Sequence, residues 1–246
     1  MAELLKIEVT KKELTEGILP MNHVLCEMFY QSEGAETSSG IVYGVNTDLV
    51  YADNDNPDDP TSHAADMAET CAKVFRCPQK LYFNPNDEKS MNWETDMELE
   101  VGDSVFTNPI ETLNAVSLVC EGKVYKLLPY HELYCAKRLN MVIMLNGYVL
   151  CLQKNKESLS TLDVTSESKV YEDRGIVTYL GNSNKRYKTD DHMDFIDLQV
   201  GDEVLFDRKY HPFLLERQTY ASRFDNENLY WVVPRRRIVA VLNRET

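Results

Sequence analysis

Short apolar runs alternate along this chain with polar segments rich in Gly, Pro, Asn and Asp. Runs such as Val24-Leu25-Cys26, Ala72-Lys73-Val74-Phe75 and Val116-Ser117-Leu118-Val119-Cys120 have the length and side chains of β-strands, and turn residues separate them. Helical periodicity is almost absent. The pattern therefore predicts an all-β fold, built as a barrel or a sandwich.

Three blocks of this pattern occur twice, in the same order. Val149-Leu150-Cys151 repeats Val24-Leu25-Cys26 at an offset of 125 residues. Residues 198–205 repeat residues 99–106 at an offset of 99 residues, and each block contains a Val-Gly-Asp turn. The third pair consists of Tyr125 to Pro129 followed by Leu133, and Tyr230 to Pro234 followed by Ile238, at an offset of 105 residues.

Strands that stay alike while the loops between them change length indicate a duplicated domain. We therefore predict two repeats, residues 1–138 and residues 139–246, with a boundary near Arg138-Leu139-Asn140. Asp103 and Asp202 occupy matching places after Gly102 and Gly201, where we expect their carboxylates to cap the turn backbone.

A small apolar group stands out in the polar segment between the first two strands. Gly40-Ile41-Val42-Tyr43 is flanked by Ser38-Ser39 and Gly44. On its pattern alone this segment is either a short strand or a loop whose aliphatic pair is kept for a partner, because soluble proteins rarely leave such a pair uncovered.

Composition and charge narrow the classes of function. The net charge of −14 argues against nucleic acid or an anionic membrane surface as the main partner. Residues 1–138 carry 11 Lys/Arg and 24 Asp/Glu, a net charge of −13, whereas residues 139–246 carry 15 and 16, a net charge of −1. No signal sequence or membrane-length apolar run is present, and the six cysteines form no Cys-x-x-Cys pair, so a cytoplasmic protein with buried, reduced thiols is expected.

Candidate chemistry is sparse. The acidic stretch at residues 48–69 lacks the central Gly and closing Glu of an EF-hand loop, which argues against the calcium alternative. Arg235-Arg236-Arg237 could hold phosphate or RNA, but a solvated turn or a salt bridge to an acidic neighbour across a subunit interface is favoured. None of the histidines has nucleophile or metal-site spacing: His23, His63, His131, His192 and His211.

One repeat, taken in order, contains an opening strand, a polar loop with Gly-Ile-Val, a strand, a long hairpin, Val-Gly-Asp and a strand, a second hairpin, and a Pro before the closing strand. This order resembles the GroES-type co-chaperonins, the lids of chaperonin folding chambers, over residues 18–138 and 140–246. The resemblance implies two tandem GroES-like, partly open β-barrels, and self-association into a ring.

The resemblance also implies the binding residues. In that family Gly-Ile-Val lies at the centre of a mobile loop that docks onto the chaperonin's apical domains, which here corresponds to Gly40, Ile41, Val42 and Tyr43. The second repeat's loop would span residues 154–173. Its nearest apolar pair is Leu162 and Val164, and these two residues complete the predicted binding site. Gly175-Ile176-Val177 is expected to form a strand and is not part of that site.

The implied function is that of a co-chaperonin without a reaction, metal or cofactor of its own. The alternative is a structural ring or collar subunit, for example in a phage virion, built on the same fold without a chaperonin partner.

Overall fold

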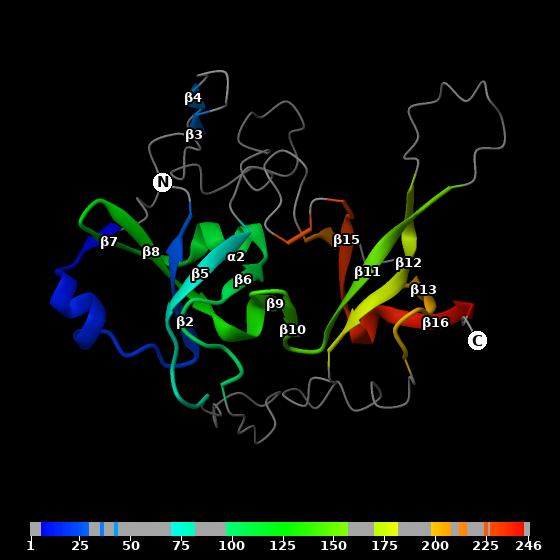
Figure 1. Ribbon diagram of the computed structural model, residues 1–246, viewed down its shortest axis with the longest axis horizontal. Coiled ribbons are helices and arrows are strands. Elements are labelled where there is room, and N and C mark those ends of the chain that lie inside the picture. Colours follow the sequence, from blue (N-terminus) through cyan, green and yellow to red (C-terminus); the bar gives the residue numbers. More distant parts are fainter. Residues whose placement is uncertain are drawn as a thin grey trace. The chain divides into compact units, whose positions relative to one another are not determined.

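The computed structural model describes residues 6–29, 35–36, 42–43, 70–81, 97–156, 170–181, 198–207, 212–215, 224–225 and 227–243. The chain separates into two compact units, and the division falls between Ile143 and Met144 (Figure 1). Each unit is built on one β-sheet, which confirms the predicted all-β class. Among the described strands, neither sheet closes into a barrel, because the first and last strands in each order are not neighbours.

The first sheet has eight strands in the order β1-β7-β8-β2-β5-β6-β9-β10. β1 runs parallel to β7, and the ladders from β7 across to β9 are antiparallel. The strands are β1 (Lys6–Glu8), β2 (His23–Met28), β5 (Cys71–Arg76), β6 (Ser104–Thr107), β7 (Val116–Cys120), β8 (Lys123–Pro129), β9 (Leu133–Arg138) and β10 (Met141–Met144).

The second sheet has six strands in the order β14-β15-β11-β12-β13-β16, and all of its ladders are antiparallel. The strands are β11 (Tyr148–Asn155), β12 (Val170–Leu180), β13 (Glu203–Phe206), β14 (Phe213–Leu214), β15 (Tyr230–Pro234) and β16 (Ile238–Asn243).

The two sheets share one strand order. β7-β8-β2-β5-β6-β9 in the first sheet corresponds strand by strand to β14-β15-β11-β12-β13-β16 in the second. The register agrees as well, because Cys26 faces Lys126 in one sheet and Cys151 faces Trp231 in the other. A β-bulge follows Leu25 in the β2–β5 ladder, and a bulge follows its counterpart Leu150 in the β11–β12 ladder. The ladders thus align the two halves at the offsets read from the sequence.

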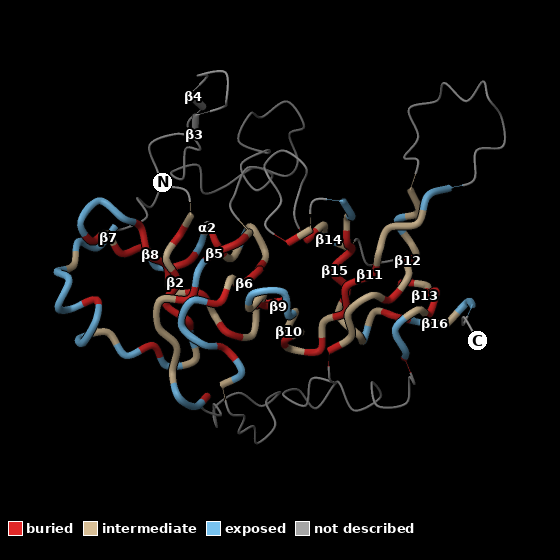
Figure 2. The backbone as a smooth tube through the Cα atoms, in the orientation of Figure 1, coloured by how far each residue is buried: buried red, intermediate tan, exposed pale blue. Residues whose placement is uncertain are grey.

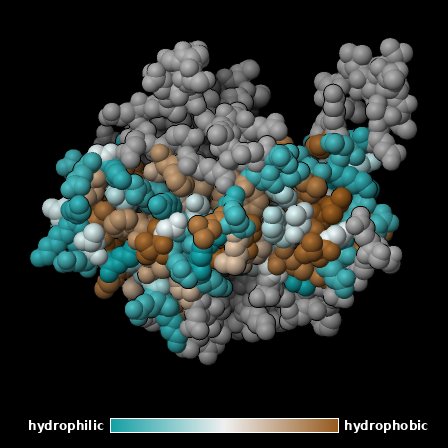
Figure 3. Space-filling model, viewed as in Figure 1, coloured by the Kyte–Doolittle hydropathy of each residue, from teal (hydrophilic) through white to brown (hydrophobic). Residues whose placement is uncertain are grey.

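Runs of buried residues lie along the strands of both sheets (red in Figure 2), and their apolar side chains form the cores. In the first unit Leu25 packs with Leu14 and Tyr125, and in the second unit Val149 packs with Phe206 and Ile238. Apolar residues also reach the surface of the described parts (Figure 3), which is normal for a folded domain unless they gather on one feature.

The helical elements are short, and the sequence pattern did not predict them all. Residues 6–17 contain both β1 and a π-helical turn, η1 (Glu13–Gly17). The helix α2 (Pro109–Asn114) was missed. The Asn108 side chain caps it by accepting a hydrogen bond from the Ile110 N–H at 2.9 Å, and Pro109 occupies its first turn. Two 3₁₀ turns, η3 (Tyr130–Glu132) and η5 (Arg235–Arg237), follow Pro129 and Pro234.

No helix in the described part of the chain has the length and apolar character needed to cross a membrane.

Candidate functional site

The predicted binding loop lies on the connection between the neighbouring strands β2 and β5. Two short strands of this connection are described, β3 (Ala35–Glu36) and β4 (Val42–Tyr43). They pair antiparallel, with Ala35 opposite Tyr43 and Glu36 opposite Val42, and they belong to neither large sheet. The backbone of two predicted binding residues is therefore placed in a small separate hairpin, whereas Gly40 and Ile41 lie outside the described residues.

The connection joins two strands whose ends are buried. In the β2–β5 ladder, Met28 faces Ala72 beside the start of the connection, and both side chains are buried. Cys71 at the start of β5 is also buried and faces Phe106. Both ends of this loop are therefore fixed by close packing in the sheet.

The matching connection in the second unit joins β11 and β12. Its ends are set by the pairing of Asn155 with Val170. Leu162 and Val164, the predicted apolar pair of this loop, lie outside the described residues.

The second Gly-Ile-Val is a strand, as predicted. Gly175-Ile176-Val177 lies within β12, where Gly175 faces Gln153 on β11 and Val204 on β13. A Cβ atom at Gly175 would lie 2.8 Å from the Cβ of Cys151 and 2.9 Å from the carbonyl oxygen of Leu152. Glycine here is explained by close packing inside the sheet.

The two Val-Gly-Asp turns have nearly identical geometry, as their sequence predicted. Gly102 and Gly201 have φ of 99° and 98°, values that favour glycine. The Asp103 carboxylate accepts a hydrogen bond from the Glu100 N–H at 2.8 Å, and the Asp202 carboxylate accepts one from the Gln199 N–H at 2.9 Å. These buried carboxylates cap their turns.

Asp103 also has a charged partner, an arginine at the end of β9. The Arg138 guanidinium donates to both carboxylate oxygens of Asp103 at 2.8 Å, a contact that sequence reasoning missed. Burial acts to raise the pKa of Asp103, but the hydrogen bonds from Arg138 and from the Glu100 backbone outweigh it and hold the pKa below its usual value. Arg138 lies at the end of β9, and a pattern along single strands does not show which residues meet across a ladder.

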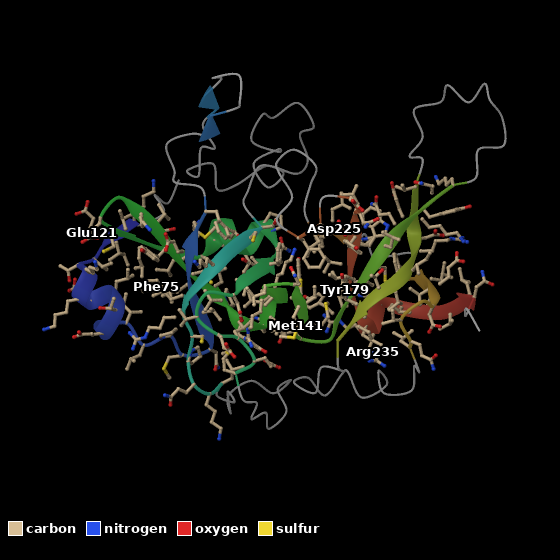
Figure 4. The ribbon with its side chains drawn as sticks, viewed as in Figure 1. Phe75, Glu121, Met141, Tyr179, Asp225 and Arg235 are labelled. Carbon is tan, nitrogen blue, oxygen red and sulfur yellow. The ribbon has the colours of Figure 1, made fainter. Side chains whose placement is uncertain are left out.

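The basic cluster lies on a tight turn within the second unit. Arg235, labelled in Figure 4, donates from its guanidinium to the Gly181 carbonyl at 3.3 Å. Arg237 pairs with Asp207 at 3.2 Å, while Arg236 is exposed. Arg237 therefore pairs with an acidic residue of its own unit. A salt bridge across a subunit interface, as the sequence suggested, stays a prediction for the cluster.

Other reactive groups carry little chemistry. Five cysteines are buried and Cys77 is half-buried, and all six are free thiols, as predicted. Burial raises the pKa of the Cys77 thiol, which disfavours the reactive thiolate. Among the residues that the structure describes, no group of three His, Cys, Asp or Glu side chains could hold a metal ion.

No protein-family model matches this chain, and no curated protein matches it. The fold and the site together define a two-unit, all-β protein whose repeated sheets differ in the connections they carry.

Proposed function

We propose that this protein is a co-chaperonin, which caps the folding chamber of a chaperonin through its first loop. The observation that carries the proposal is the β3–β4 hairpin. It belongs to the connection that contains Ile41 and Val42, and its two strands pair with each other and with neither sheet. A binding element that stands apart from the core sheet can engage a partner without disrupting the fold.

The shared strand order of the two sheets further supports the resemblance on which the proposal rests. Only the first repeat has two adjacent aliphatic residues in its loop, because Asp163 separates Leu162 from Val164 in the second. The proposal therefore gives the docking role to the first repeat, and the second repeat serves the assembly of the ring.

The expected affinity of one loop is low. Burying Ile41 and Val42 in an apolar groove contributes about 1.5–3 kcal/mol for each side chain. Ordering the loop costs about 1–2 kcal/mol for each residue that is fixed. These terms nearly cancel, so useful attachment requires several loops on one ring, each raising the local concentration of the next. Weak multivalent attachment also suits a lid that must leave in every cycle.

The test is co-sedimentation with a GroEL-type chaperonin in the presence of nucleotide. We expect the wild-type chain to sediment with the chaperonin, Ile41→Asp to lose at least about tenfold in binding, and Leu162→Asp to bind like wild type. Equal losses in both variants would refute the assignment of the first loop. Failure of the wild-type chain to bind would reject the co-chaperonin and favour the structural ring or collar subunit.

A further inference from the structure

A tight turn, residues 145–148, connects β10 to β11 (Figure 1). Its central residues are Asn146 and Gly147, with φ of 52° and 72°, and the Tyr148 N–H donates to the Leu145 carbonyl at 3.0 Å. These are the features of a type I′ turn, for which Asn-Gly is a preferred sequence. Asn-Gly occurs only once in the whole sequence. The turn geometry explains the pair, but the pair also brings a chemical reactivity of its own.

An asparagine side chain can react with the backbone of the residue that follows it. The peptide nitrogen of that residue loses its proton and forms a bond to the carbonyl carbon of the side-chain amide, while the bond to the amide nitrogen breaks and ammonia leaves. Water then opens the resulting cyclic imide at either of its carbonyls, which gives aspartate or isoaspartate. A side chain on the following residue hinders the attack, and glycine has none.

The turn leaves the attacking nitrogen available. Gly147 makes its backbone hydrogen bond through its carbonyl, which accepts from the Arg235 N–H at 2.9 Å. Among the residues that the structure describes, no backbone acceptor holds the Gly147 N–H. Asn146 is half-buried, so water still reaches it. The attack therefore requires rotation about the Asn146 backbone, but no backbone hydrogen bond at the attacking nitrogen has to break.

The surroundings of the turn favour the charges that develop in the reaction. Arg235 begins the basic turn η5, and its guanidinium donates to the Gly181 carbonyl at 3.3 Å. The Gly181 N–H in turn donates to the Tyr148 carbonyl at 3.2 Å, so Arg235 and the Asn146-Gly147 pair lie at the same end of the second sheet. A positive charge nearby stabilises the deprotonated nitrogen, the oxyanion of the attack and the carboxylate of the product.

We propose that Asn146 is a site of deamidation in the folded chain, converted to aspartate and isoaspartate through an imide with Gly147. Isoaspartate adds a methylene group to the main chain, and a tight turn of fixed length does not accommodate the longer path. The hydrogen bond between Tyr148 and Leu145 is then lost, which loosens the start of β11 because Tyr148 is its first residue. The modification acts on the connection between the two sheets, and it stands whether or not the first loop binds a chaperonin.

A second asparagine of the same chain provides an internal control. Asn140 lies in the turn between β9 and β10 and is exposed, but Met141 follows it. Exposure alone would make Asn140 react first, whereas the imide mechanism requires Asn146 to react first. The test is peptide mapping by mass spectrometry after the folded chain has been incubated at neutral and at mildly alkaline pH, with isoaspartate detected by enzymatic methylation. We expect Asn146 to convert at least severalfold faster than Asn140, and faster at the higher pH, because the attacking nitrogen must lose a proton.

Asn146→Gly is the matched variant, because Gly-Gly also forms a type I′ turn but has no side-chain amide. Its melting temperature should stay constant during incubation, whereas that of wild type should fall as isoaspartate accumulates. Asn146→Asp carries the charge of the product on an unaltered backbone and should melt like fresh wild type. The proposal is overturned if Asn146 stays unmodified in the folded chain, whether or not Asn140 reacts, or if it reacts only after the chain has been unfolded in urea. Either failure leaves the result of the chaperonin co-sedimentation unchanged, so the two proposals are tested separately.

Discussion

Asp103 is almost fully buried, yet it is bound by a charged partner from another strand. Its carboxylate accepts hydrogen bonds from the Glu100 N–H and from the Arg138 guanidinium. Arg138 also pairs with the exposed carboxylate of Glu100 at 2.7 Å. Replacing Asp103 by Ala would leave the turn N–H and the partly buried Arg138 without this acceptor. We expect Asp103→Ala to lower the free energy of unfolding by about 2–3 kcal/mol, measured by urea denaturation.

Glu100→Ala is the control for this prediction because it removes another carboxylate from the same arginine while keeping the turn backbone. The Glu100 side chain is 69% exposed, so the loss should stay within about 0.5 kcal/mol. Equal losses in the two variants would show that burial of Asp103 does not strengthen its pairing.

Asp225 in the second unit makes stability depend on pH. Its carboxylate accepts hydrogen bonds from the Asn228 side chain and the Glu227 N–H, and from the Tyr230 hydroxyl at 2.8 Å. These contacts, led by the Asn228 side chain, lower the pKa of Asp225 from 3.8 to about 2. The folded chain therefore holds fewer protons than the unfolded chain in this range, and the contribution of Asp225 is lost as the pH falls through it.

We expect the stability advantage of wild type over Asp225→Asn to shrink from about pH 5 to about pH 2, as measured by urea midpoints. Glu227→Gln is the control, since Glu227 contacts Asp225 through its backbone N–H, and the side-chain change should leave the pH profile in place. A constant difference between wild type and Asp225→Asn would contradict the low pKa.

At the level of elements, the strands were predicted well where turn residues bracket them. The hairpin of β7 and β8 turns at Glu121 and Gly122, both with positive φ, as Glu-Gly between two apolar runs predicts. β10 was missed because its apolar run coincides with the expected domain boundary, and no local pattern shows that a linker adds a strand. The six-residue helix α2 was missed because it is too short to display a helical period, although Asn108-Pro109 is a helix-start signal.

The candidate site was less predictable than the fold. Sequence reasoning named the Gly-Ile-Val segment at residues 40–42 and distinguished it from the second Gly-Ile-Val at residues 175–177, which forms a strand. The distinction was possible because the neighbouring sequence blocks fixed the position of each segment in its repeat. It did not show that β16 is the last of the described strands in the second sheet. The exposure of Val239 depends on which strand lies beside it, and in the sequence its apolar run resembles that of β9.

Close packing between β11 and β12 gives a prediction for this pair of strands. The Cβ atom added by Gly175→Ala meets a backbone oxygen and a Cβ atom at under 3 Å, and neither can rotate away. We expect a loss of about 1–3 kcal/mol in the free energy of unfolding. Gly17→Ala is the control, because its Cβ would meet only Glu13 side-chain atoms at 3.6 Å and beyond, and a near-neutral result is expected. An unchanged stability of Gly175→Ala would mean that the two strands separate readily.

At the scale of the whole molecule, the net charge of −14 opposes any contact between copies of the chain. Most of this charge lies in residues 1–138. The ring that the proposed co-chaperonin would form must assemble against this repulsion. Salt should therefore screen the repulsion between copies and favour the ring.

Association should therefore strengthen as the salt concentration rises, whereas a contact held by opposite charges would weaken. Raising NaCl from about 50 mM to about 500 mM, where the screening length falls below about 10 Å, should strengthen the association severalfold in sedimentation velocity. If salt instead dissociates the wild-type assembly, opposite charges hold it together. The exposed Arg236 and the acidic first half would then be the surfaces to examine.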